Sequence, residues 1–236
     1  MGRVKALLVV LVLLAALLVA ADRVGVYEAQ QLVSNKLAST YHLGERPAVD
    51  IKGVPFLTQW ASGDFQEIDV DLGSANAGGM QVTDVTAQMK DVSTKAFARS
   101  GQDVAGSRIG TLGLTGTVSY ASIPVPDGFK LSPSGDKLQL SGSYSVFGRS
   151  IPVTALISVG VSGGHLQMHV DQVQSSNSYI SQVVGAAIDR QIQSQAFLRQ
   201  LPLGVQLDSA TVGADGLHIT GSARKLTLPA SIPTPA

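Results

Sequence analysis

The chain has 236 residues, no cysteine, and equal numbers of basic and acidic residues, so its formal net charge at neutral pH is zero. The lack of cysteine excludes a disulfide framework, a thiolate nucleophile, a cysteine metal site and a lipid-modified cysteine. Charged residues make up 14% of the chain, compared with about 25% in a typical soluble domain. This composition indicates a chain that buries much of its length or presents apolar surface to another molecule.

The N-terminus carries the features of an export signal. Arg3 and Lys5 precede an unbroken apolar run from Ala6 to Ala21, which gives a charged n-region followed by a hydrophobic h-region. The small residues at the end of the run offer a cleavage site before Asp22. We therefore expect residues 1–21 to act as a signal peptide or as an N-terminal membrane anchor.

Residues 4–21 are also roughly long enough to span a bilayer, so cleavage and retention both stay open. In either case the basic end stays in the cytoplasm, and we expect the rest of the chain to lie in the periplasm or cell envelope. Without Arg3 and Lys5, the 17 basic residues fall to 15 against 17 acidic ones, a net charge of −2. This balance does not suggest a basic surface for nucleic acid.

The pattern after the apolar run predicts one α+β domain over residues 22–228 and a disordered, Pro-rich tail over 229–236. Val26, Ala29, Val33 and Leu37 form one stripe of an expected amphipathic helix over 24–40. Phe56, Leu57 and Trp60 predict a further short helical turn. A second amphipathic helix is expected over 178–197, with Ser178 as its N-cap.

The period then changes to two, which predicts antiparallel strands with one buried face. A phase slip near Thr83-Asp84 predicts a β-bulge, and Gly163-Gly164 predicts a tight hairpin. The simplest assembly is one strongly curved antiparallel meander that wraps one or two helices. The expected strands are 48–54, 65–72, 80–92, 109–123, 129–131, 137–147, 150–162, 165–175, 205–212 and 217–228.

One short motif matches the nucleophile elbow of serine hydrolases. Gly160-Val161-Ser162-Gly163-Gly164 has the Gly-x-Ser-x-Gly pattern, whose chemistry needs a strand-to-helix turn. An alternating strand follows Ser162 instead of a helix, so a hairpin is the better interpretation. An esterase using Ser162 is kept only as a remote alternative.

Two other groups of polar residues are better explained without chemistry. His165 and His169 face the same side of an expected strand, where we interpret them as exposed residues and not as zinc ligands. Glu67, Asp69 and Asp71 alternate with aliphatic residues, which is typical of the solvated face of a strand. The sequence therefore predicts no enzyme activity, no metal site and no cofactor.

Aromatic residues make up only 5% of the chain, although aliphatic alternation is extensive. Packed sandwiches of this length usually fill their centres with large rings as well. A chain of Val, Leu, Ile, Ala and Gly is also compatible with an enclosed apolar cavity. Such a cavity would sit just outside a membrane.

Several segments, in this order, resemble the LmeA-like family of actinobacterial envelope proteins. An apolar segment and an amphipathic helix precede Val54-Pro55-Phe56-Leu57. Gly63 to Leu72 follows as Gly-x-Phe-x-x-Ile-x-Val-x-Leu, and then come a meander, a second helix, Leu201-Pro202-Leu203 and Asp215-Gly216-Leu217. The resemblance covers nearly the whole exported chain, and its motifs are fold-forming and not catalytic.

The resemblance implies a periplasmic phospholipid-binding protein with a fold similar to tubular lipid-binding domains of the BPI-like kind. It also implies a role in supporting lipomannan elongation or lipid transport at the outer face of the cytoplasmic membrane. The expected partner is phospholipid, held by its acyl chains in an apolar groove. An envelope scaffold with a solid core is the alternative.

The candidate lipid-contacting residues come from the apolar faces of the two expected helices, where ordinary helix-to-sheet packing is the competing interpretation. They are Val33, Leu37, Val183, Val184, Ala187 and Ile188. Arg190 and Arg199 are the candidate head-group ligands, and a solvated helix face is the alternative role for both.

Overall fold

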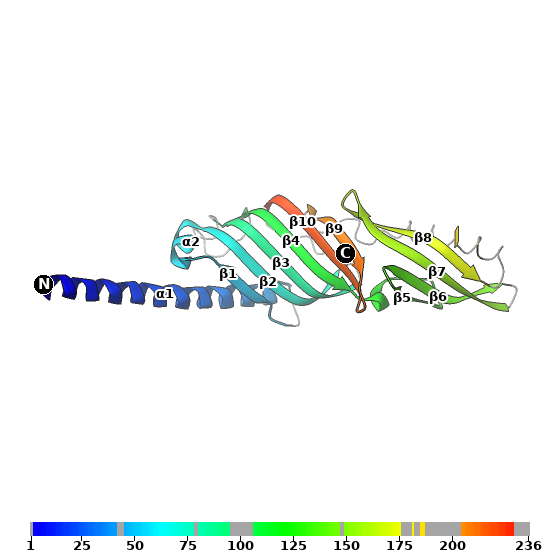
Figure 1. Cartoon of the computed structure of the whole chain (residues 1–236), viewed down its shortest axis with the longest axis horizontal. Coiled ribbons are helices and arrows are strands. Elements are labelled where there is room, and N and C mark those ends of the chain that lie inside the picture. Colours follow the sequence, from blue (N-terminus) through cyan, green and yellow to red (C-terminus); the bar gives the residue numbers. More distant parts are fainter. Residues whose placement is uncertain are drawn as a thin grey trace. The chain divides into compact units, whose positions relative to one another are not determined.

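The computed structural model confirms an α+β fold built from a long helix and two antiparallel sheets. The first sheet has six strands in the order β1-β2-β3-β4-β10-β9, and the second has four in the order β5-β6-β7-β8 (Figure 1). The strands therefore divide between two sheets, where the sequence pattern suggested one meander. The structure describes residues 2–41, 45–77, 80–94, 106–146, 149–175, 181, 185–186 and 204–228.

The six-stranded sheet is formed by β1 (Ala48–Lys52), β2 (Asp64–Ala77), β3 (Met80–Ser93), β4 (Arg108–Val118), β10 (Leu217–Thr227) and β9 (Gln206–Val212). The four-stranded sheet is formed by β5 (Phe129–Ser134), β6 (Lys137–Val146), β7 (Arg149–Ser162) and β8 (His165–Ser175). A single 3-10 turn, η1 (Tyr120–Ser122), follows β4. These bounds confirm most of the expected strands, although β1 and β4 end earlier than predicted.

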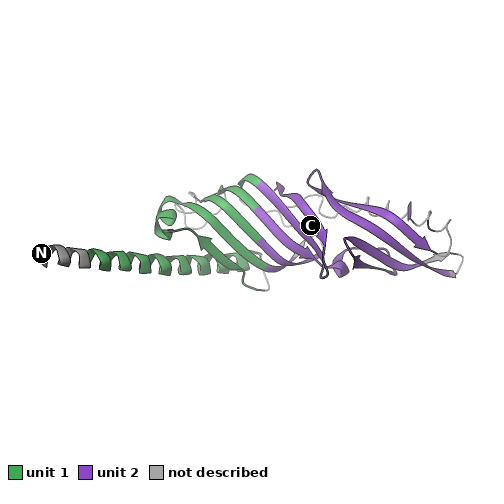
Figure 2. Ribbon diagram, viewed as in Figure 1, with its two compact units in different colours: residues 1–72, 87–112, 224–232 green, residues 73–86, 113–223, 233–236 purple. Residues whose placement is uncertain are grey.

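The chain divides into two compact units (Figure 2). The first unit consists of Met1–Leu72, Ala87–Leu112 and Arg224–Ile232. The second unit consists of Gly73–Thr86, Gly113–Ala223 and Pro233–Ala236, and it holds the whole four-stranded sheet. The sequence-based boundaries at residues 21 and 228 stay predictions, and the tail from 229 lies outside the described residues.

The apolar run and the predicted amphipathic helix form one continuous helix, α1 (Gly2–Tyr41). The large apolar side chains from Val10 to Val19 are 52–68% exposed. Beyond Asp22 one face turns inward, because Ala29 is buried and the rest of the predicted stripe is half-buried. Within the described part of the chain, one helical stretch, Val10–Ser39, is long and apolar enough to cross a membrane.

Two buried polar side chains of α1 form hydrogen bonds with the rest of the first unit. Asp22 accepts a hydrogen bond at Oδ1 from the backbone N–H of Leu57, at 2.9 Å. Ser34 donates from Oγ to the carbonyl oxygen of Pro47, at 2.6 Å. A buried polar group without a partner costs about 1–3 kcal/mol, so both positions favour this one placement of the helix.

The short helix α2 (Phe56–Ser62) confirms the helical turn expected there. It ends at Gly63, whose left-handed backbone (φ 71°) lets its N–H bond to the carbonyl of Gln59 at 2.8 Å. Phe56 is buried, and its ring lies 5.8 Å from that of Trp60 and 6.3 Å from that of Phe65. The helix is therefore packed onto the start of β2 by aromatic contacts.

Bulges keep the apolar side chains of neighbouring strands on the same face. The predicted phase slip in β3 is seen in its burial pattern, which changes phase between Val82 and Thr83, next to Asp84 with φ 52°. In the β7–β8 pair, Ile157 faces Val170 whereas Leu156 faces Gln172, so Asp171 is the extra residue. Without that extra residue, every apolar side chain beyond it on β8 would turn to the opposite face.

Asp171, the extra residue on β8, forms an ion pair and a hydrogen bond with the neighbouring strands. Lys137 Nζ donates to Asp171 Oδ2 at 2.7 Å, and Ser158 Oγ donates to Oδ1 at 3.0 Å. The hydrogen bond from Lys137 is the main cause that holds the pKa of Asp171 below its ordinary value of 3.8. The ionised carboxylate is therefore the form that favours the native bulge.

We expect Asp171→Asn to lower the free energy of unfolding at pH 7 and to have a smaller effect in acid. A carboxylate whose pKa is lowered on folding stabilises the native state above its unfolded pKa. That stabilisation is lost as the pH falls through 3.8 and then through the lower native value. Urea unfolding of the full chain in detergent, between pH 7 and pH 2.5, measures the difference.

The matched control is Asp127→Asn, which makes the same charge change at an exposed turn residue before β5. An effect of Asp171→Asn that stays constant with pH, or one no larger than that of the control, would contradict the role given to this carboxylate.

The second predicted helix is described at only three positions, all helical: Ser181, Gly185 and Ala186. Ser181 Oγ lies 3.0 Å from Ser175 Oγ at the end of β8. A Cβ atom at Gly185 would lie only 3.0 Å from Cγ2 of Val173. Glycine therefore lets the helix approach β8 closely at this point.

We expect Gly185→Leu to lower the free energy of unfolding by about 1–3 kcal/mol, as overpacking does elsewhere. Val173→Ala makes room, so a double-mutant cycle measured by chemical denaturation is expected to show favourable coupling between the two changes. The neighbouring residue provides the control, since Ala186→Leu introduces the same side chain at an exposed position. Equal effects of the two leucine substitutions would count against this packing.

Candidate functional site

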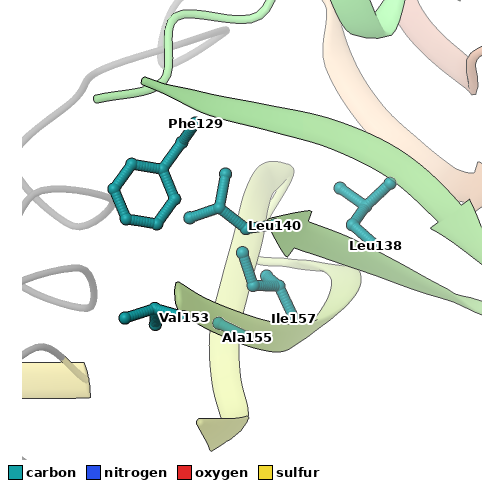
Figure 3. Close-up of a cluster of buried hydrophobic side chains, with 6 residues drawn as sticks. All are labelled: Phe129, Leu138, Leu140, Val153, Ala155 and Ile157. Atoms are coloured by element: carbon teal, nitrogen blue, oxygen red, sulfur yellow. The ribbon is translucent and has the colours of Figure 1, made fainter. Parts of the chain in front are cut away.

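The inner face of the four-stranded sheet carries a cluster of buried hydrocarbon side chains (Figure 3). Strand alternation selects them, because every second residue of β6 and β7 points to this face. Leu138 and Ala155 at its centre have no solvent exposure. The cluster consists of Phe129, Leu138, Leu140, Val153, Ala155 and Ile157.

A second buried cluster in the same unit comes from the six-stranded sheet and the segment after β4. Its members are Met80, Val82, Val118, Ile123, Ala210 and Leu217. Tyr120, Leu131, Val159 and Val212 pack against both clusters. The two clusters, these shared residues and the β8 side chains that pack against them form one apolar region, which we call the aliphatic face. Its β8 row consists of Leu166, Met168, Val170 and Val173.

Burial falls from the centre of the aliphatic face toward β8. The buried cluster on β6 and β7 is at most 2% exposed, whereas Met168, Val170 and Val173 on β8 are only half-buried. Leu166, next along the same side of β8, is half-buried and packs against the second cluster. The apolar side chains of β8 therefore pack against the buried clusters on one side and are partly exposed to solvent on the other.

Hydrogen bonds to backbone carbonyl groups connect the parts of this region. The Tyr120 hydroxyl lies 2.6 Å from the carbonyl oxygen of Gly213 and 2.9 Å from that of Gly216, so it donates into the β9–β10 turn. Burial raises the pKa of Tyr120. At the β7–β8 hairpin, the carbonyl of Gly164 accepts from the N–H of Leu207 at 3.0 Å. The hairpin is thereby tied to β9.

Most of the predicted lipid-contacting residues cannot be placed. Val183, Val184, Ala187 and Ile188 lie outside the described residues, and so do the predicted head-group ligands Arg190 and Arg199. Gly185, the described residue between them in sequence, lies close to Val173 on β8.

Val33 and Leu37 are half-buried on the inward stripe of α1. They belong to the first unit, whereas the aliphatic face belongs to the second. A role for them in lipid contact stays a prediction.

The sequence pattern did not single out the residues of β8 that the structure brings to the aliphatic face. The available signal was the alternation of Leu166, Met168 and Val170 with His165 and His169 along the strand. Alternation alone does not show that this side of β8 lies at the edge of a buried cluster.

The nucleophile-elbow motif is a hairpin, as the following strand predicted. Ser162 and His165 are paired across the turn, and Gly163 and Gly164 have φ 60° and 77°. Both side chains are exposed at a strand end, so no buried oxyanion pocket of the kind this chemistry needs is formed at Ser162. His169 is exposed on the same side of β8 as His165, which confirms their predicted orientation.

The acidic row of β2 is a solvated strand face, as expected. Lys52 Nζ donates to Glu67 Oε1 at 2.8 Å and also contacts Asp69. That hydrogen bond from Lys52 is the main cause of the lowered pKa of Glu67. Among the described residues, no group of three or more His, Cys, Asp or Glu side chains is placed to hold a metal ion.

Comparison with known proteins agrees with the resemblance found in the sequence. A search of the curated proteins and a search of the solved structures each find no match. A sequence profile described as LmeA-like phospholipid-binding matches residues 20–222. That range includes every described strand except the end of β10. With well over half of its length covered, the chain belongs to the LmeA-like phospholipid-binding family.

Proposed function

We propose that this protein is a non-enzymatic phospholipid-binding protein of the cell envelope that holds acyl chains against the aliphatic face. The half-buried apolar row on β8 beside a dry cluster is the observation that carries the proposal. Family membership supports phospholipid as the ligand.

The row on β8 is longer than one acyl chain. From Leu166 to Val173 the strand extends about 24 Å at 3.4 Å per residue. The hydrocarbon core of a bilayer is about 30 Å thick, so one acyl chain reaches about 15 Å. One chain therefore fits along the row with room to spare.

Hydrocarbon burial alone supplies enough free energy for binding. Each buried methylene contributes about 0.8 kcal/mol, so ten contribute about 8 kcal/mol before the costs of association. No charged partner for the lipid tail is needed. Arg190 and Arg199, in the same region of sequence as the second helix, stay the proposed head-group ligands.

The exposed apolar half of α1 supports a location outside the cytoplasm. Under the positive-inside rule, Arg3 and Lys5 stay on the cytoplasmic side, which supports a periplasmic or envelope location for the body of the protein. Support of lipoglycan elongation and lipid transport are the pathway roles that the family resemblance suggests.

The competing proposal is an envelope scaffold with a solid core. The same cluster supports it, because the central side chains Leu138 and Ala155 have no solvent exposure. The two proposals differ at β8, where a scaffold requires protein to cover the half-buried row and a lipid-binding protein requires lipid.

We expect native mass spectrometry of the full chain, released gently from detergent, to detect a bound phospholipid. Met168→Glu is expected to abolish that binding, because a carboxylate in the row disfavours acyl chains. Gln167→Glu is the matched control, since it adds the same charge one residue away on the exposed side of β8. Circular dichroism checks that both variants fold.

Met168→Gln gives a second, uncharged test at the same position and is expected to weaken lipid binding partially. A wild-type chain without exchangeable phospholipid would overturn the proposal in favour of the scaffold. Equal lipid binding by Met168→Glu and Gln167→Glu would show that lipid does not occupy the β8 row.

A further inference from the structure

The first unit carries a separate apolar surface where α1 leaves its exposed segment. Val54 is 73% exposed, Leu57 41% and Trp60 44%. Leu57 and Trp60 are three residues apart and share one face of α2, whereas Phe56 and Gln59 are buried on the opposite face. We call Val54, Leu57 and Trp60 the α2 patch.

The α2 patch is fixed to α1 directly after the apolar run. The backbone N–H of Leu57 bonds to Asp22 at 2.9 Å, and Asp22 is only 4% exposed. One turn further, a Cβ atom built at Gly25 would lie 3.4 Å from Leu57 Cδ2 and from the Phe56 ring, so α1 and α2 are in close contact there. Figure 1 shows α2 beside α1, with the N-terminal half of α1 extending beyond it.

The position of this contact along α1 matches the boundary of the hydrocarbon core of a bilayer. Residues 4–21 form 18 helical residues, or about 27 Å at 1.5 Å per residue. The hydrocarbon core is about 30 Å thick. If this segment crosses a membrane, the core ends within one turn of Asp22, where α2 is attached.

The chemistry of the patch also matches the interfacial region of a bilayer. Tryptophan is enriched at the boundary between hydrocarbon and head groups. Val24, 63% exposed on α1, extends the apolar surface from the run toward Gly25 and α2. Arg23 lies beside it with its side chain 53% exposed, and its guanidinium donates to Asp22 Oδ2 at 2.7 Å.

We propose that the α2 patch is a membrane seat that inserts into the outer interface of the same bilayer that α1 spans. The proposal rests on the proposed function only in placing α1 across a membrane. A second contact next to the anchor restricts the tilt of α1, and so holds the first unit in a defined orientation on the membrane surface.

Trp60 is the only tryptophan in the sequence, so its intrinsic fluorescence tests the proposal without a label. The full chain is reconstituted in vesicles of phosphatidylcholine and phosphatidylglycerol that carry bromine atoms near the head-group end of the acyl chains. We expect a blue-shifted emission that loses at least half of its intensity relative to unbrominated vesicles. Acrylamide in the aqueous phase is expected to quench it weakly.

The matched control moves the fluorophore within the same unit. In the double variant Trp60→Phe, Asn35→Trp, the tryptophan replaces an exposed residue 13 positions beyond Asp22 on α1, about 20 Å further along the helix. We expect strong quenching by acrylamide and little by bromine. Equal bromine quenching at positions 60 and 35, or none at position 60, would overturn the proposal.

A pair of charge variants provides a second measurement that keeps Trp60. Val54→Asp is expected to reduce bromine quenching at least twofold, because a carboxylate withdraws the patch from the interface. Leu32→Asp, at a 56% exposed apolar residue ten positions beyond Asp22, is expected to leave quenching unchanged. Equal quenching of both variants would contradict insertion of the patch.

Failure of this proposal is distinguishable from failure of the proposed function. In micelles with one equivalent of brominated phospholipid, Trp60 quenching is expected to be absent, because the acyl chain is assigned to the second unit. Quenching of Trp60 in these micelles would contradict the proposal, because it would make Trp60 part of the lipid-binding site. A blue shift that depends on protein concentration in micelles, without bromine quenching in vesicles, would assign the patch to contact with a second copy.

Discussion

The pairing of β7 with β8 across the extra residue Asp171 determines how the second unit presents its apolar side chains. Strand side chains alternate between two faces, so one unpaired residue is enough to move an entire row from the core to solvent. The bulge places Val170 and Val173 on the same face although they are an odd number of residues apart. Lys137 and Ser158 hold the extra residue in place from the opposite face.

This arrangement explains why hydrocarbon residues have two different environments in one sheet. On the central strands β6 and β7 the side chains of the buried cluster are at most 2% exposed, and they stabilise the unit by burial. The outer strand β8 contributes the same residue types at the margin of the cluster, where they are only half-buried. A protein that binds a long apolar ligand needs both a rigid dry wall and an accessible apolar row beside it.

Much of this fold follows from local sequence patterns. Helical spacing predicted the stripe through Ala29 and Leu37, the glycine pair predicted the hairpin at Gly163-Gly164, and a break in alternation predicted the phase slip near Asp84. What local pattern could not show was the division of the strands into two sheets, since strand order depends on contacts distant in sequence. Local pattern also did not predict that the apolar run and the amphipathic helix form one helix, because a charged residue such as Asp22 is typical of a boundary, whereas here it is buried and hydrogen-bonded within α1.

The candidate site was less predictable for a related physical reason. The apolar face of the expected second helix predicts Val183 and Ile188 as lipid contacts, yet an apolar face alone does not distinguish core from ligand site. The useful distinction is the degree of burial, which separates Leu140 from Met168 although both alternate identically along their strands. Tyr120 likewise has no sequence signature, because its partners are the carbonyls of a turn more than 90 residues away.

The central claim is that lipid acyl chains lie against the β8 row of the aliphatic face. The most direct measurement is a set of intermolecular nuclear Overhauser effects between methyl-labelled Met, Leu and Val side chains and protonated phospholipid, with the full chain in deuterated detergent. We expect contacts from Met168 and Val170 to acyl methylenes, and none from Leu138 at the closed centre of the cluster. Contacts absent from the β8 methyl groups, with the lipid bound elsewhere or not at all, would contradict the account.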